Sequence, residues 1–127
     1  MPSYFRFKVL CDKLKDQTLA DLDSLIEKYN AKPDIERLVK EGEGELFSIK
    51  SLNHENRIFL ESTVLLPSLL FEKNIDDFIY VVENWINLTS TIRNQIGSNC
   101  EWKAYIDDLI LVWDARKKKY VLPSLLL

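Results

Sequence analysis

His54 is the only histidine of the chain, so any catalytic arrangement with an imidazole base would have to use it. Such a base needs a third group that fixes its ring and a nucleophile within hydrogen-bond reach. His54 lies in the polar stretch from Asn53 to Asn56, which is typical of a turn open to water. We therefore expect a surface turn residue here and predict no catalytic residue.

Asp107, Asp108 and Asp114 are the clustered carboxylates that could hold a metal ion or carry out acid–base chemistry. Adjacent residues of a strand point to opposite faces, so Asp107 and Asp108 could share an ion only in a turn. We expect solvated turn positions, and we predict no metal and no cofactor. Whether the three carboxylates converge in a cleft stays open, so an enzyme built on them remains an alternative.

Cys11 and Cys100 form neither a metal-binding spacing nor a short redox pair. The N-terminal sequence lacks a basic segment followed by an apolar core, so we expect a cytoplasmic location. Thiols are kept reduced in that compartment, and both cysteines should therefore be free. No apolar run approaches the roughly 18 residues of a membrane span, so no membrane partner is predicted.

The chain has 127 residues and a formal net charge of −3, which fits one α+β domain over residues 1–127. Binding to nucleic acid draws much of its affinity from neutralised phosphates, and the only basic run is Arg116 to Lys119. Strand aromatics could stack bases, but no recognition motif accompanies them, and core packing is the expectation for the phenylalanines. These aromatics are Tyr4, Phe5, Phe7 and Phe59. We predict no nucleic-acid partner.

The hydrophobic pattern predicts strands and helices in the order β-α-α-β-β-α-β-β. These strands are expected at 4–10, 45–52, 57–66, 101–106 and 109–114, and the helices at 18–30, 33–41 and 75–96. A further strand at 119–122 is expected to close the C-terminal hairpin. Thr18 and Asp21 resemble a capping box, Gly42 suits a helix C-cap, and Asn74 suits an N-cap. We predict an antiparallel sheet with helices on one face: a ferredoxin-like split β-α-β core and a C-terminal β-hairpin.

This topology has one consequence that can be tested. It places the end of the first strand beside the start of the strand that follows the long helix, so Cys11 and Cys100 should be neighbours. A Cα separation well above the ~7 Å limit for a disulfide would count against the predicted register.

The outer face of the long helix is the first predicted partner-binding surface. Its polar stripe consists of Tyr80, Glu83, Asn84, Asn87, Thr91 and Asn94. Exposed helices usually carry Lys and Glu, whereas low charge with a tyrosine is typical of an interface core. The alternative is a helix face partly covered by the chain's own C-terminal tail, and we keep both interpretations.

A second candidate surface is the acidic segment 34–45, of which Glu36, Glu41 and Glu43 could meet a basic protein. Together the two surfaces predict a non-enzymatic protein-binding domain of the inhibitor, immunity-protein or anti-defence type, which occludes its partner. The alternative is a small-molecule-sensing or dimeric regulatory domain of ferredoxin-like fold. The apolar tail 123–127 should dock on its own domain or on a second copy, so a homodimer is also considered.

Overall fold

The computed structural model describes residues 3–66, 74–96 and 100–123. Within them, five strands form an antiparallel sheet in the order β2-β3-β1-β4-β5, and β6 pairs with β7 in a separate hairpin. The elements are β1 (Ser3–Asp12), α1 (Asp16–Asn30), α2 (Pro33–Glu41), β2 (Lys50–His54), β3 (Arg57–Leu66), α4 (Ile75–Ile96), β4 (Cys100–Ile106), β5 (Leu109–Ile110), β6 (Val112–Asp114) and β7 (Lys119–Val121). The predicted α+β class is confirmed.

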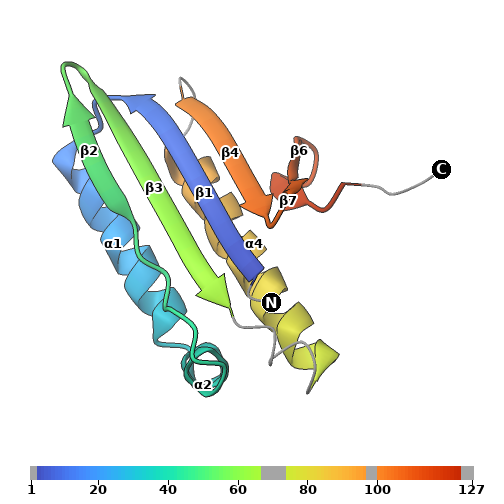
Figure 1. Cartoon of the computed structure of the whole chain (residues 1–127). Helices are drawn as coiled ribbons and strands as arrows, with labels where there is room; N and C mark the ends of the chain where they lie inside the picture. Colours follow the sequence, from blue (N-terminus) through green and yellow to red (C-terminus); the bar gives the residue numbers. More distant parts are fainter. Residues whose placement is uncertain (1–2, 67–73, 97–99, 124–127) are drawn as a thin grey trace.

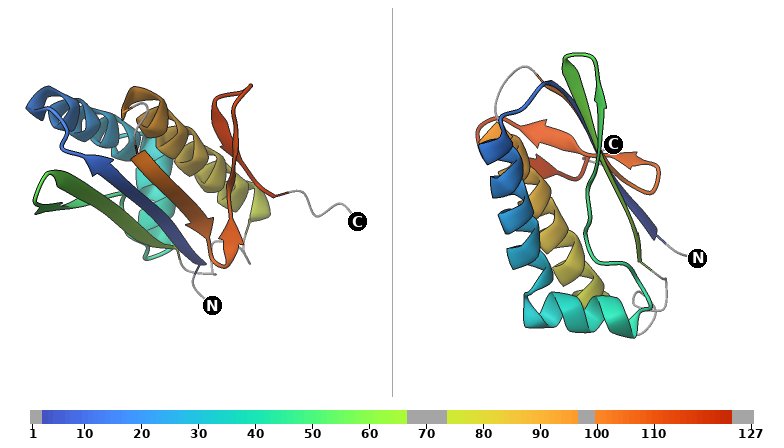
Figure 2. Two further views of the ribbon diagram at one scale, coloured as in Figure 1. Left: turned by 90° about the horizontal axis from the view of Figure 1, so that it is seen from above. Right: turned by 90° about the vertical axis from the view of Figure 1, so that its left-hand side faces the viewer.

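The central strand β1 separates the two faces of the sheet by its alternation. Phe5, Phe7 and Val9 are fully buried on one face, and the ring of Phe5 meets that of Trp85 of α4 edge-on at 5.3 Å. Helices α1 and α4 lie on this side of the sheet, behind the strands in the view of Figure 1, and α2 runs across the lower end of the fold in the right-hand view of Figure 2. The core therefore lies between the sheet and the helices.

Helix α1 begins at Asp16, two residues before the predicted start, so the predicted capping box is wrong. No side chain caps its N-terminus at Lys15. Asp21 instead accepts a hydrogen bond of 2.8 Å from the side chain of Gln17, one turn earlier in the helix. Helix α2 follows the prediction, with a proline in its first turn and Gly42 at its C-cap.

Helix α4 spans the predicted 22 residues. Asn74 caps it, because its Oδ1 accepts the backbone N–H of Asp76 at 3.0 Å. The helical spacing of the apolar residues predicts Ile75 and Ile79 on the buried face of this helix, but they are 56% and 44% exposed. Figure 1 shows why: the first turns of α4 project beyond the ends of the strands. The sequence predicts that Gly97 stops this helix and that Pro67 ends the strand at 57–66, and both residues lie outside the described residues.

Strand β2 begins at Lys50, five residues later than predicted. Phe47 is buried, and both of its backbone groups bond to the side-chain amide of Asn30: Nδ2 donates to the carbonyl at 2.8 Å, and Oδ1 accepts the N–H at 3.0 Å. This pairing with the end of α1 replaces strand pairing. Residues 45–49 therefore tie the helix layer to the sheet.

The predicted strand 109–114 is divided between two sheets. Leu111 is buried, and its N–H donates to the carbonyl of Ala104 at 2.9 Å, whereas Ile110 and Val112 on either side are exposed. The chain turns into the core at Leu111, which leaves β5 at the sheet edge and moves β6 into the hairpin with β7. The predicted C-terminal hairpin is present, and the tail beyond residue 123 lies outside the described residues.

Cys11 and Cys100 are directly opposite each other on β1 and β4 and are joined by a disulfide with a Cα separation of 4.3 Å. The predicted proximity is confirmed. The expectation that both thiols are free is wrong, because this register brings the two sulfur atoms within bonding distance. Among the described residues, no helix combines the length and the apolar character needed to cross a membrane.

Candidate functional site

A groove of about 170 Å³ lies between α1 and α4. Helix α4 contributes side chains at i, i+3, i+4 and i+7 and α1 contributes side chains at i, i+3 and i+4, the spacing that places residues along one helix face. Lys32, the N-cap residue of α2, completes the lining. The lining residues are Leu25, Lys28, Tyr29, Lys32, Asn84, Asn87, Leu88 and Thr91. The groove is thus a direct product of two helical stripes packed side by side.

The inner surface of the groove is apolar, and its α4 rim is polar but uncharged. Tyr29 and Leu88 are 7% and 5% exposed, whereas Asn87 and Thr91 are exposed. Burial raises the pKa of the Tyr29 hydroxyl well above its usual range, with a smaller contribution from nearby Tyr80. The Tyr29 hydroxyl therefore stays protonated and can donate a hydrogen bond.

Hydrogen bonds fix part of the rim. Lys32 Nζ donates to Asn84 Oδ1 at 2.9 Å, and Asn84 Nδ2 donates to the carbonyl of Tyr80 at 2.8 Å. Thr91 Oγ1 donates to the carbonyl of Asn87 at 2.7 Å. The side-chain amide of Asn87 has no hydrogen bond within the described residues and is exposed. It can offer both its donors and its acceptor to a partner.

The predicted stripe of α4 is divided among three environments. Asn84, Asn87 and Thr91 line the groove, and Glu83 is exposed outside its lining. Tyr80, expected to be exposed, is half-buried because it packs against the core.

The hairpin reaches the last residue of the stripe. Asn94 Nδ2 donates to the carbonyl of Lys118 at 2.9 Å, in the turn between β6 and β7. Part of the stripe is therefore open, and the part near the C-terminal end of α4 is held by the protein's own hairpin.

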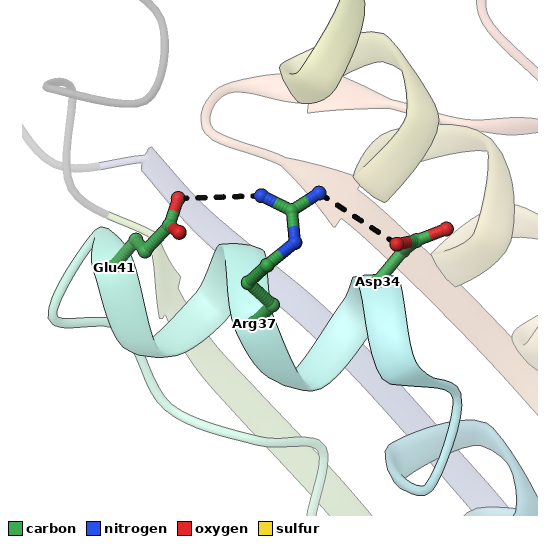
Figure 3. Close-up of polar contacts among 3 residues, drawn as sticks. All are labelled: Asp34, Arg37 and Glu41. Atoms are coloured by element: carbon green, nitrogen blue, oxygen red, sulfur yellow. Dashed lines mark ion pairs between the residues drawn. The ribbon is translucent and has the colours of Figure 1, made fainter.

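The acidic segment on α2 is partly neutralised by its own bases. Arg37 pairs with Asp34 at 3.6 Å and with Glu41 at 3.5 Å, as Figure 3 shows, and Lys40 pairs with Glu36 at 2.6 Å. These are local pairs one helical turn apart at solvent-exposed positions. Such pairs contribute little to stability.

Glu43 follows α2 and is exposed, with a backbone φ of 56°. Together with Glu36 and Glu41 it completes the predicted acidic set. None of the three residues lines the groove.

Of the residues considered for catalysis, His54 is exposed, and Asp107 and Asp114 bond to backbone N–H groups. His54 is exposed at the end of β2. Asp107 Oδ1 accepts the N–H of Tyr4 at 2.8 Å, and Asp114 Oδ1 accepts those of Arg116 and Lys117 at 3.0 and 3.1 Å. Within residues 3–66, 74–96 and 100–123, no three His, Cys, Asp or Glu side chains form a group that could hold a metal ion.

The α1 side of the groove was missed at the level of sequence. The signal was present, because Leu25, Lys28, Tyr29 and Lys32 have the same spacing as the α4 residues. What the sequence does not reveal is which two faces meet. No protein-family model, no curated protein and no solved structure matches this chain.

Proposed function

We propose that the protein is a non-enzymatic protein-binding domain of the inhibitor, immunity-protein or anti-defence type, which occludes its partner through the α1–α4 groove. One observation carries the proposal: the hollow between α1 and α4 has an apolar inner surface, and its α4 rim consists of the uncharged polar side chains of Asn84, Asn87 and Thr91, opposite Lys28 and Lys32. Interface cores are depleted in charge, and partner side chains commonly anchor in such hollows.

The size of the groove favours a protein partner over a small molecule. Sites for drug-sized ligands usually enclose about 300–1,000 Å³ and bury most of the ligand. The groove holds about 170 Å³, which suits one inserted side chain. Asn87 would bond the backbone beside that side chain, and the Tyr29 hydroxyl would meet its tip.

A basic partner belongs to this proposal. Glu36, Glu41 and Glu43 lie on or just after α2, which contacts α4. The ion pairs of Glu36 with Lys40 and of Glu41 with Arg37 are exposed, so they can be exchanged for pairs with a partner at small cost. Exposed charges of this kind mainly steer association and set its salt dependence.

We also propose a ferredoxin-like core and a cytoplasmic location. The order β2-β3-β1-β4 with antiparallel neighbours supports the former, since a split β-α-β unit has that arrangement. The Cys11–Cys100 disulfide opposes the latter, because the cytoplasm keeps thiols reduced, so the redox state of this pair in the cell decides the location. Trapping of thiols in intact cells, followed by mass measurement, tests the location: a fully oxidised pool contradicts it.

A dimeric regulatory domain is the second candidate. Ile110, Val112 and Leu122 are 61%, 50% and 51% exposed in the segment that leaves the sheet edge. An apolar edge of this kind favours self-association. Sedimentation of wild type and of Ile110→Lys tests this candidate, and a concentration-independent monomer in both proteins rejects it.

The groove is tested with a matched pair of variants. Affinity purification with the wild-type chain identifies a partner, and titration of that purified partner then measures Kd. Asn87→Lys should weaken binding at least about tenfold, because it places a charge on a rim that the bound partner would desolvate. Asn53→Lys makes the same change at an exposed position of β2 and should leave Kd unchanged. Equal affinity of both variants for the partner overturns the proposed site.

A further inference from the structure

The sheet face opposite the helices is richer in basic than in acidic side chains, although the whole chain has a net charge of −3. Strand register places five basic and three acidic residues of β1–β4 on this face. They are Arg6, Lys8, Lys50, Arg57 and Lys103, against Asp12, Glu61 and Glu101. The net charge of the chain therefore conceals a separation of charge between the two sides of the fold.

A row of charged side chains crosses the middle of this face. The register aligns Lys50 with Glu61, Glu61 with Lys8, and Lys8 with Lys103. Glu61 lies between two lysines that offset its charge, whereas Lys8 and Lys103 oppose each other directly. Like charges at facing positions destabilise a sheet. Glu61 beside Lys8 and Glu101 beside Lys103 offset part of this repulsion, and an anion bound across the pair would offset the rest.

Flat cationic and aromatic groups flank the lysine row. On one side, the Arg6 guanidinium lies 4.6 Å from the ring centre of Tyr105 and donates to the carbonyl of Asp107 at 3.2 Å, so its plane is held in place. On the other side lies the half-buried ring of Phe59, directly opposite Leu10. Same-face residues of a strand are about 6.8 Å apart, so these planes and the lysines alternate at short intervals.

A polar hollow of about 220 Å³ adjoins the row at its β2 end. It is lined by Glu45, Ser48, Lys50, Glu61 and Thr63. Its carboxylate and hydroxyl oxygens can accept hydrogen bonds from the amino groups of a base edge. The hollow is thus chemically different from the cationic row and complements it.

We propose, against the expectation from the sequence, that this face binds single-stranded nucleic acid. Lys8, Lys50 and Lys103 contact the phosphates, and bases stack on the Arg6–Tyr105 pair and on Phe59. An anionic membrane would use the charge alone, whereas alternating cations and flat groups match the alternation of phosphate and base. The surface lies on the opposite side of the sheet from the α1–α4 groove, so the inference is independent of the proposed protein partner.

Fluorescence anisotropy with a labelled 12-nucleotide oligo-dT or oligo-U is the test. Wild-type protein should bind both saturably at 50 mM salt. The slope of log K against log salt should be about −2 to −3, since each phosphate contact of a single strand contributes about −0.7. Tyr105→Leu removes a stacking surface and should weaken binding at least about fivefold with little change in slope.

Lys103→Glu separates binding from folding. It converts a facing like-charge pair into an attractive one, so its Tm should rise by about 1–5 °C. Affinity for the oligonucleotide should nevertheless fall at least about fivefold, with a shallower salt slope. A loss of binding in a more stable protein cannot come from unfolding.

Lys28→Glu is the matched control, because it makes the same charge change on the helix side and should leave oligonucleotide binding unchanged. The inference is overturned if the wild type does not bind at 50 mM salt or if Lys28→Glu weakens binding as much as Lys103→Glu. Equal binding of poly-aspartate or anionic vesicles, with no effect of Tyr105→Leu, also overturns it. Titration of a purified protein partner with Asn87→Lys reports on the groove separately.

Discussion

The disulfide between Cys11 and Cys100 should supply a large part of the stability of the protein. It links positions 89 residues apart. The chain-entropy relation gives about 4.6 kcal/mol for closing a loop of that length in the unfolded state. Small domains have a total free energy of unfolding of about 5–15 kcal/mol. Reduction should therefore remove about a third of the stability or more.

Urea unfolding of one preparation, with and without a reducing agent, measures this contribution. With an m-value of about 2 kcal/mol/M, the midpoint should fall by roughly 2 M on reduction. The same protein is compared in two redox states, so no cavity is introduced at the buried Cys11. The Cys11→Ala/Cys100→Ala variant should unfold near the reduced wild type and should not respond to the reductant.

Two results would refute this reasoning. Titration of the denatured, non-reduced protein could find two reactive thiols per chain, which would mean that no disulfide forms. Alternatively, the oxidised and reduced midpoints could agree within about 0.2 M although the bond is present. The second result would mean that the unfolded chain gains no freedom on reduction, and the loop-closure argument would fail.

Three further predictions concern single side chains. Burial raises the pKa of Tyr29 in the folded state, so the stability that this side chain contributes is complete below about pH 10 and declines above it, by up to about 1.4 kcal/mol per pH unit. In Tyr29→Phe, the free energy of unfolding measured with urea should therefore fall less between pH 9.5 and 11.5 than in the exposed control Tyr4→Phe. The hydroxyl of Ser62 is buried with no hydrogen-bond partner within the described residues, so Ser62→Ala should raise the unfolding free energy by about 1 kcal/mol, and the exposed Ser51→Ala should not; a destabilised Ser62→Ala would mean that the hydroxyl is satisfied. Asn74 caps α4, so Asn74→Ala should lower thermal stability by about 1 kcal/mol and Asn74→Ser should restore most of it; equal melting of both variants would argue against the cap.

Local patterns predicted the elements whose signals are strong and self-contained. The apolar stripe and the Asn74 cap predicted α4, and the alternation of Phe5, Phe7 and Val9 predicted β1. The order of these elements then predicted that Cys11 lies beside Cys100, and the register of β1 and β4 confirms it. Each of these features follows from neighbouring residues in the sequence or from the order of the elements, so it can be predicted from the sequence alone.

Features that depend on contacts between residues far apart in the sequence could not be predicted. Residues 45–49 have a strand-like composition, yet Asn30 binds the backbone of Phe47 and takes the place of a neighbouring strand. The strand expected at 109–114 breaks because Leu111 gains more from the core than from the sheet edge. In both cases a long-range contact outweighed local β-propensity, as commonly happens.

Only the α4 side of the candidate groove could be predicted from the sequence. The low charge of α4 predicted Asn84, Asn87 and Thr91 as binding residues. The residues that face them across the groove can be identified only once the packing of the two helices is known. The acidic segment was visible as composition only. Its ion pairs, such as that of Arg37 with Asp34, show that counting charges overstates the field that a helix presents.

The two unusual features of the sheet lie on the same pair of strands. Lys8 faces Lys103 three positions along the ladder from the Cys11–Cys100 link. Repulsion between the lysines favours separation of β1 from β4, and the covalent bond opposes it. The bond can therefore hold a cationic pair closer together than strand pairing alone would allow. If this is so, reduction should weaken oligonucleotide binding in wild type and should have less effect in Lys103→Glu, where the strands already attract each other.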